Sequence, residues 1–175
     1  LYVYNLEGKM ETEVTLPTMG TAYGFGGKME DTEVFYTFTS FAYPTTVFRY
    51  DIRKNISALY RQSEIGIDFS KYETKQIFYS SKDGTQIPMF ITHKKGLIYD
   101  GTAPTLLYAY GGFNISINPH FSISRMLFIE SGGIYATANL RGGGEYGESW
   151  HEDGMLTNKQ NVFDDFIAAA DFLVE

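Results

Sequence analysis

The sequence has 175 residues, a net charge of −7 and no cysteine, and 43% of its residues are hydrophobic. This composition is typical of a folded globular chain, and an acidic balance without a basic run argues against a nucleic-acid partner. The lack of cysteine excludes a disulfide framework and a thiolate zinc site. No segment approaches the roughly 18 apolar residues that a membrane span needs, so no membrane partner is expected.

Both ends of the sequence fall inside predicted elements. Residues 1–8 (LYVYNLEG) begin within a strand pattern, without an initiator methionine or a signal peptide. Residues 171–175 (DFLVE) stop within a helix pattern. We therefore expect an internal segment of a longer protein. Composition does not distinguish a cytoplasmic from a periplasmic location, so the expected location is one of these two.

Short strands separated by turns are predicted over the first third of the sequence. In residues 33–41 (EVFYTFTSF), Val34, Tyr36 and Phe38 alternate with the intervening side chains, and a period of two is the period of a strand. Four further strands are predicted at 1–6, 21–26, 46–52 and 57–61. Turn signals such as EGK and GGKMEDT space them like an antiparallel meander, which sandwiches, barrels and propeller blades all contain.

We interpret residues 63–73 as a linker, because the pattern of short strands and turns ends there. Residues 74–96 predict a hairpin, because the Asp-Gly pair in KDGT suits a type I′ turn. Two buried strands are predicted within 103–112 (APTLLYAYGG) and 132–144 (GGIYATANLRGGG). Their near-continuous apolar runs favour a parallel sheet that is covered on both faces.

Two helices accompany these strands. The first is predicted over 121–133 and would end at Gly132, because glycine readily adopts the left-handed conformation after a helix. One of its faces would combine Phe121, Ser124, Arg125, Phe128 and Ile129. The second is predicted over 161–175 with Asn161 as its cap. Its apolar positions at helical spacing are Val162, Phe163, Phe166, Ile167, Ala170, Leu173 and Val174. The alternation of strands and helices indicates an α/β domain.

No single motif assigns a chemistry. The histidines His93, His120 and His151 lack ligand spacing and no cysteine accompanies them, so neither a metal nor another cofactor is expected. The stretch 141–147 (RGGGEYG) does not match the G-x-G-x-x-G pattern of a dinucleotide site, and we interpret it as a tight crossover loop. No G-x-S-x-G nucleophile elbow occurs in the sequence.

Three segments taken together resemble one family of serine peptidases. They are YAYGGFNIS at 108–116, ANLRGGGEYGESWHEDG at 138–154 and NKQNVFDDFIAAADFL at 158–173, in the family's own order. On these motifs the sequence resembles the prolyl oligopeptidase family, and within it the members that cleave after proline. The likeness runs from about residue 33 to the end of the sequence.

This resemblance implies a fold in two parts. Residues 1–70 would be the C-terminal part of a seven-bladed β-propeller that covers the mouth of the peptidase domain. Residues 71–175 would be the N-terminal half of an α/β-hydrolase domain. In such proteins the propeller admits short peptides and excludes folded proteins. The implied partners are therefore short proline-containing peptides, and the implied full-length protein is a monomer.

The resemblance also implies that the catalytic triad lies outside this sequence. Asp165, Ala169 and Leu173 fit the front of the family's serine signature, which continues beyond Glu175 into a G-x-S-x-G-G elbow. The serine, aspartate and histidine of the triad would all follow that point. Asp164 and Asp165 are therefore not the triad acid, and we interpret them as acidic residues that suit the start of a helix.

Two site residues are carried over from the family's motif. Tyr110 would be the tyrosine whose hydroxyl donates a hydrogen bond to the oxyanion, a preorganised donor of the kind that acyl transfer requires. Phe113 would be an aromatic wall of the proline pocket. The alternatives are that Tyr110 is a buried aromatic whose hydroxyl is bonded locally, and that Phe113 is an ordinary core residue. Arg141 and Glu145 are expected to brace their loop rather than to contact substrate.

The resulting hypothesis is a fragment of a serine peptidase that cleaves short peptides after proline through an acyl-enzyme. The alternatives within the family are an oligopeptidase with basic specificity and an acylaminoacyl peptidase. An alternative of another class is a propeller–hydrolase protein that binds without catalysis. A serine between glycines beyond Glu175 would support an enzyme, and its replacement would support the binding protein.

Overall fold

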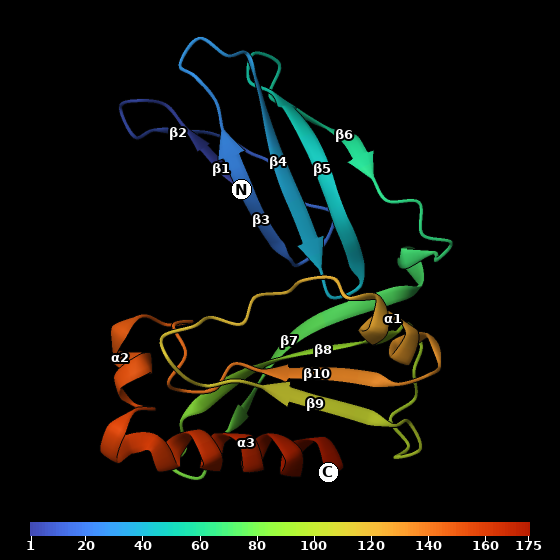
Figure 1. The fold of residues 1–175 in the computed structure, drawn as a ribbon, viewed down its shortest axis with the longest axis vertical. Coiled ribbons are helices and arrows are strands. Elements are labelled where there is room, and N and C mark those ends of the chain that lie inside the picture. Colours follow the sequence, from blue (N-terminus) through green and yellow to red (C-terminus); the bar gives the residue numbers. More distant parts are fainter. The chain divides into compact units, whose positions relative to one another are not determined.

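The structure, a computed structural model, describes all 175 residues, and the chain divides into two compact units (Figure 1). The N-terminal unit comprises Leu1–Phe69 together with Pro119–Ser122. The C-terminal unit comprises Ser70–Asn118 and Ile123–Glu175. No helix in the structure has the length and apolar character that crossing a lipid bilayer requires.

The N-terminal unit is built from antiparallel strands. β1 and β2 form a two-stranded sheet, and β3 to β6 form a four-stranded meander in chain order. The strands are β1 (Tyr2–Tyr4), β2 (Met10–Glu13), β3 (Thr21–Gly26), β4 (Glu33–Ser40), β5 (Tyr43–Asp51) and β6 (Ile56–Gln62). The five predicted strands are confirmed, whereas β2 was not predicted because METE shows no apolar alternation. A four-stranded antiparallel sheet is also the form of one propeller blade.

The core of this unit follows the period of two in β4. Tyr36 and Phe38 are 2% and 0% exposed, while Phe35, which points to the opposite face of the strand, is 40% exposed. Tyr36 stacks on Phe48 of β5, and Val14 and Tyr50 complete the buried cluster. Tyr36 and Phe38, from one of the two alternating sets, therefore contribute the buried aromatic side chains of this strand.

The C-terminal unit is a mixed sheet in the order β7-β8-β10-β9. β9 and β10 are parallel, and the two other pairs are antiparallel. Its strands are β7 (Tyr72–Ser80), β8 (Gln86–Lys94), β9 (Thr105–Ala109) and β10 (Ile134–Ala138). Its α-helices are α1 (Ile123–Glu130), α2 (Glu148–Glu152) and α3 (Lys159–Val174), and short 3₁₀ turns occur at η1 (Phe69–Lys71) and η2 (Leu156–Asn158).

Helices cover both faces of this sheet. Ala136 and Ala138 of β10 belong to a core cluster that includes Ala169 of α3. Tyr135, which precedes Ala136 and so points to the opposite face of the strand, accepts a hydrogen bond from Arg125 of α1. Figure 1 shows α3 running along one side of the sheet and α1 lying on the other, as the near-continuous apolar strands predicted.

The turn between β7 and β8 differs from the prediction. A type I′ turn needs positive φ at both central residues, but only Gly84 in this loop has it, at 87°. The Gly84 N–H donates to the Ser81 carbonyl, so a turn with ordinary φ angles precedes a left-handed glycine. The hairpin itself is confirmed, whereas the type I′ geometry is wrong because three residues, Lys82 to Gly84, connect the paired Ser81 and Thr85, and a loop of this length takes an ordinary turn followed by a left-handed glycine.

Both predicted helices are confirmed, with corrections to their details. Gly132 ends α1 as predicted, with φ of 99° and hydrogen bonds from the N–H groups of Gly132 and Gly133 back to the last turn. The buried residues of α1 are Met126 and Ile129, so the predicted face was only partly right. Asn161 is not a cap: α3 already begins at Lys159, and the Asn161 amide donates to the Asp153 carbonyl.

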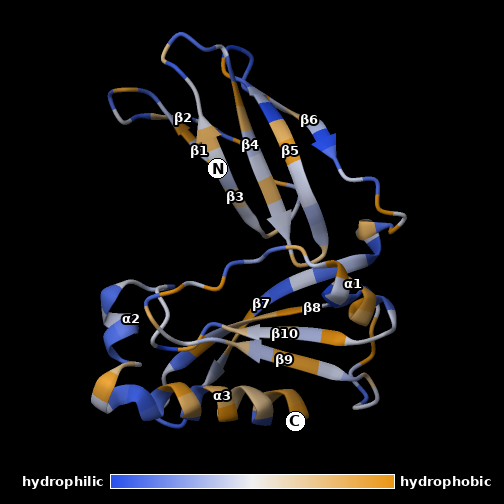
Figure 2. Ribbon diagram, viewed as in Figure 1, coloured by the Kyte–Doolittle hydropathy of each residue, from blue (hydrophilic) through white to orange (hydrophobic).

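The buried face of α3 was also predicted incompletely. Its fully covered residues are Val162, Asp165 and Ala169, and one of them carries a charge. Phe163 and Ile167 were expected to be apolar contacts but are 53% and 57% exposed. Figure 2 shows hydrophobic positions along α3 beyond its hydrophilic first residues, so hydropathy alone could not separate the face against the sheet from the exposed one.

Candidate functional site

Two loops meet at the carboxyl ends of the parallel strands β9 and β10. Ala109 and Ala138 are paired in the sheet, so the chain leaves both strands at the same edge. One loop begins at Tyr110, and the other contains the glycines that follow Arg141. Ligands of open α/β sheets bind outside the carboxyl ends of the strands, so this edge is the first place to look for a site.

Gly111 fixes how closely the two loops approach. It is buried and has a positive φ of 62°. A Cβ atom at this position would stand 2.6 Å from Cγ1 of Val162 and 2.9 Å from Cβ of Leu140. Only glycine satisfies both the backbone conformation and the available space, so Gly111 seats the segment against α3 and the second loop.

The next residues form a tight turn with unusual backbone angles. The Ile115 N–H donates to the Gly112 carbonyl at 3.1 Å, and both central residues have positive φ, 53° at Phe113 and 55° at Asn114. Positive φ at both positions is the signature of a type I′ turn. Asparagine tolerates this conformation, whereas a bulky residue such as phenylalanine is strained in it. The turn holds the Phe113 side chain outward, 83% exposed.

Three groups outside the turn hold it in place. The Asn114 N–H donates to the Gly142 carbonyl at 3.1 Å, and the His151 Nδ1 atom lies 3.2 Å from the Asn114 nitrogen and 2.8 Å from the Gly142 oxygen. The Lys159 ammonium donates to the Gly111 carbonyl at 2.9 Å. The segment after β9 is therefore tied both to the second loop and to the first residue of α3.

The structure locates the two predicted site residues on this segment. Tyr110 directly follows β9, is 46% exposed, and its hydroxyl makes no hydrogen bond within the chain. Phe113 is at the tip of the turn. Within these 175 residues, the Tyr110 hydroxyl is not hydrogen-bonded and the Phe113 ring is not part of a core. Their roles toward a substrate stay predictions.

A buried ion pair anchors the second loop. Arg141 is 4% exposed, and its Nη2 and Nε atoms donate to the fully buried Asp165 carboxylate of α3 at 2.6 and 3.0 Å. The Arg141 Nη1 atom donates to Asp83 in the β7–β8 turn at 2.6 Å. Ser81 donates to Asp165 at 2.5 Å. One guanidinium thus joins the second loop, the hairpin turn and α3.

The charges in this network shift one another's pKa values in the directions that pairing requires. The hydrogen bond from Arg141 holds the pKa of Asp83 well below its usual range, and the hydrogen bond to Asp165 raises the pKa of Arg141 further. Burial, reinforced by the Asp165 charge, raises the pKa of the neighbouring Tyr79 hydroxyl. Asp83 and Arg141 stay charged and the Tyr79 hydroxyl stays neutral at neutral pH, so the shifts indicate a structural network rather than a proton relay.

The remaining residues of the second loop also brace it. Glu145 accepts hydrogen bonds from the Ile117 N–H and the Asn139 amide, both at 2.9 Å. The Trp150 indole donates to the Leu140 carbonyl at 3.1 Å. The prediction that Arg141 and Glu145 brace their loop is confirmed by these contacts.

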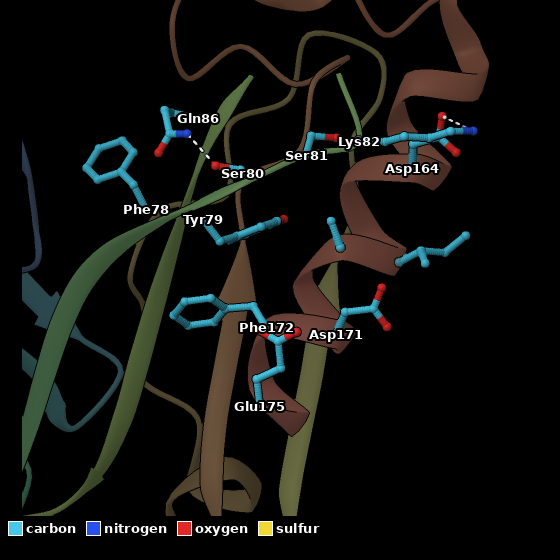
Figure 3. Close-up of a pocket in the computed structure, with 12 residues that line it drawn as sticks. Phe78, Tyr79, Ser80, Ser81, Lys82, Gln86, Asp164, Asp171, Phe172 and Glu175 are labelled. Carbon is cyan, nitrogen blue, oxygen red and sulfur yellow. Dashed lines mark hydrogen bonds and ion pairs between the residues drawn. The ribbon is translucent and has the colours of Figure 1, made fainter. Parts of the chain in front are cut away.

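A cavity of about 630 Å³ lies elsewhere, between β7 and α3. In Figure 3 the Tyr79 ring reaches from the strand toward the helix, where its hydroxyl donates to the Asp165 carbonyl at 2.9 Å. Phe78, Asp171 and Phe172 also line this cavity. Neither Tyr110 nor Phe113 lines it, so it is not the site at the carboxyl edge. No group of three or more histidine, cysteine or acidic side chains is arranged to hold a metal.

Two family models match the chain in succession. The model of the prolyl oligopeptidase N-terminal β-propeller domain matches residues 1–63, and the model of the prolyl oligopeptidase family of peptidases matches residues 119–175. The chain belongs to the prolyl oligopeptidase family. Its first residues are thus propeller strands, and its α/β part is the beginning of the family's hydrolase-type peptidase domain.

Individual members of the family are similar over nearly the whole chain. A prolyl endopeptidase of Elizabethkingia miricola is 48% identical over 97% of the chain, and one of Dictyostelium discoideum is 44% identical over 99%. The chain spans 24% and 23% of these two relatives, respectively. It therefore represents about a quarter of their length.

Solved structures of family members have the same fold. A structure from an analysis of two prolyl endopeptidases superposes with a TM-score of 0.87 and 46% identity, over 97% of this chain and 25% of that one. Prolyl oligopeptidase B of Galerina marginata, bound to a 35-residue hydrolysis and macrocyclisation substrate, superposes with a TM-score of 0.88 and 40% identity. This match covers 99% of the chain and 25% of the Galerina protein.

Sequence reasoning missed three residues that build the site in this family member. Asp165 was interpreted as a helix-start acid, although it is the buried partner of Arg141. Lys159 and His151 were not connected with the Tyr110 segment, because the contacts span 48 and 37 sequence positions. A signal was present for Lys159, since a cation is unfavourable at the start of a helix and needs another reason to be there.

Proposed function

We propose that the chain is part of a serine peptidase that hydrolyses short peptides on the carboxyl side of proline. The observation that carries the proposal is the anchored turn after β9, which presents a half-exposed tyrosine and an exposed phenyl ring at the carboxyl edge of the sheet. Relatives named prolyl endopeptidase, more than 40% identical over this segment and its surroundings, support the choice of substrate.

In the proposed reaction, a serine that follows Glu175 in the full-length protein attacks the peptide carbonyl. The carbonyl oxygen becomes negative, and the Tyr110 hydroxyl donates a hydrogen bond to it. The amine leaves, and water then hydrolyses the acyl-enzyme. The Phe113 ring forms one wall of the pocket that receives the flat pyrrolidine of proline. The reaction needs no cofactor.

The same proposal assigns the domains and the partners. Residues 1–70 are the C-terminal part of the propeller, and residues 71–175 are the N-terminal half of the peptidase domain. The full-length protein acts as a monomer on short proline-containing peptides, in the cytoplasm or the periplasm, without a nucleic-acid or membrane partner. Size-exclusion chromatography of the full-length protein tests the monomeric state, and fractionation of its host cells tests the location.

The test of the function is a substrate comparison with the purified full-length protein. Chromogenic peptides with proline, alanine or arginine before the leaving group, and an acylated single amino acid, are compared by kcat/KM. We expect preference for proline and inactivation by a serine-directed organophosphate. Preference for arginine would indicate an oligopeptidase with basic specificity, and preference for the acylated amino acid would indicate an acylaminoacyl peptidase. Peptide binding without turnover would identify a binding protein.

A further inference from the structure

Lys159 occupies a position that its own helix does not favour. It is the first residue of α3, and the first turn of this helix contains no acidic residue. The positive end of the helix dipole lies there, so a cation is repelled rather than stabilised. Residues that break a local rule are expected at functional sites, where contacts beyond their own element can account for them.

The Lys159 ammonium contacts one group in the loop after β9 and one side chain of its own helix. Its ammonium donates to the Gly111 carbonyl at 2.9 Å and lies 5.9 Å from the centre of the Phe163 ring. It makes no ion pair, whereas Lys82 and Lys94 each pair with a carboxylate. The half-buried Lys159 side chain therefore makes its one hydrogen bond to a peptide carbonyl.

That carbonyl belongs to the peptide between Gly111 and Gly112. Gly111 is held by packing, whereas the Gly112 side of the peptide has no close neighbour. A Cβ on Gly112 would find no atom nearer than 3.9 Å, and the two it would find are the Lys159 ammonium and Cε1 of the Tyr110 ring. Both groups therefore lie beside the same peptide, and the lysine is the side chain that fixes its orientation.

We propose that Lys159 is a positioning residue for the Tyr110 hydroxyl: by holding the Gly111 carbonyl, it keeps the Gly-Gly peptide in one orientation and the tyrosine aimed at the developing oxyanion. This inference rests on the proposed peptidase function. Lys159 contacts neither the substrate nor the reacting atoms in this assignment. It acts through the peptide that follows Tyr110.

The experiment replaces Lys159 in the full-length protein. Lys159→Met keeps the length of the side chain and its packing on Phe163 but removes the donor, whereas Lys159→Arg keeps a cationic donor. We expect Lys159→Met to lower kcat by between about 10-fold and 10²-fold, the cost of a misplaced group, with KM changed less than about threefold. Lys159→Arg should restore part of the loss. Lys82→Met, which removes an exposed lysine paired with Asp164 of the same helix, is the matched control.

A double-mutant cycle with Tyr110→Phe separates positioning from a general structural role. If Lys159 acts through the tyrosine hydroxyl, Lys159→Met costs less than about threefold once that hydroxyl is absent. An equal loss in both backgrounds, or a kcat of Lys159→Met within about threefold of the unmodified protein, overturns the inference. If Tyr110→Phe itself leaves kcat unchanged, the proposed oxyanion role fails as a separate result.

Amide hydrogen exchange tests the same inference without any activity. The N–H groups of Asn114 and Ile115 are hydrogen-bonded in the anchored segment. We expect faster exchange over residues 110–116 in Lys159→Met than in Lys82→Met, with unchanged exchange in β8 and β10. Unchanged exchange over 110–116 overturns the positioning role, even if the protein hydrolyses no peptide at all.

Discussion

Tyr110 contributes one hydroxyl to the proposed reaction, and this group can be removed alone. The hydroxyl makes no hydrogen bond within the chain, so Tyr110→Phe should leave the melting temperature unchanged. Loss of one oxyanion donor costs on the order of 10²–10³ in kcat, or roughly 2.7–4 kcal/mol. KM should change far less, because the ground-state carbonyl is a weaker acceptor. Kinetics and thermal melting of one variant check both statements, and a kcat within about threefold of the unmodified protein would contradict the role.

Phe113 is expected to act on recognition rather than on chemistry. Phe113→Ala removes the exposed ring while alanine keeps the same strained backbone, so stability should change little. The loss of kcat/KM should correspond to about 1–3 kcal/mol for a substrate with proline at the cleaved position, and to less for one with alanine. The two substrates are compared with the same variant. Equal losses on both would assign Phe113 a structural role.

Asp83 gives the protein a pH-dependent contribution to stability. Its pKa in the folded protein is lowered, chiefly by the hydrogen bond from Arg141, from an ordinary value of 3.8. A lowered pKa stabilises the fold above the ordinary value, and this stabilisation is lost as the pH falls through the folded-state pKa. Asp83→Asn should therefore be less stable than the unmodified protein at pH 7. Urea unfolding at pH 7, 5 and 3.5 should show that the difference shrinks only below about pH 4.

At the scale of the elements, the Arg141–Asp165 pair joins α3 to two loops. Asp165→Asn leaves the buried Arg141 guanidinium with Asp83 as its remaining carboxylate partner, and breaking a buried pair in this way costs about 3–5 kcal/mol. The neighbouring Asp164→Asn is the control, because it loses only an ion pair with the largely exposed Lys82 and should cost about 0–1 kcal/mol. Denaturant unfolding of the full-length protein gives both values.

A double variant shows whether the stability depends on the Arg141–Asp165 ion pair or on the packing of the two side chains. Replacing both partners, as Arg141→Met with Asp165→Leu, leaves no unpaired charge and should be less destabilised than Asp165→Asn alone. A double variant at least as unstable as the single one would show that the hydrogen bonds to Ser81 and Asp83 carry the stability instead.

The elements themselves were largely predictable, because period and turn chemistry are local. The alternation in β4 and the glycine that ends α1 required no knowledge of distant residues. The buried face of α3 was not predictable in full, since Asp165 is buried only because Arg141, 24 positions away, lies against it. In the site, the motif supplied Tyr110 and Phe113, but the positive φ of Phe113 and the contact of Lys159 arise from tertiary structure.

At the scale of the whole molecule, the sheet of the C-terminal unit ends in β9. This strand pairs with β10 on one side only, and Leu106 and Tyr108 on it are 45% and 44% exposed. An unpaired apolar edge is a template for association. We expect the isolated 175-residue chain to aggregate and to show no peptidase activity. Light scattering and an assay on a proline-containing chromogenic peptide check this, and turnover that an organophosphate abolishes would contradict it.

The left-handed backbone at Phe113 has a consequence for any attempt to engineer this protein. A non-glycine residue held in such a conformation costs of the order of 1–3 kcal/mol, and glycine at the same position relieves that cost. Directed evolution for heat resistance alone would therefore favour Phe113→Gly, and the more resistant descendants would lose the ring proposed to recognise proline. Heat resistance favours glycine at this position, whereas the proposed selectivity for proline requires phenylalanine. A mutant library should therefore keep Phe113 fixed.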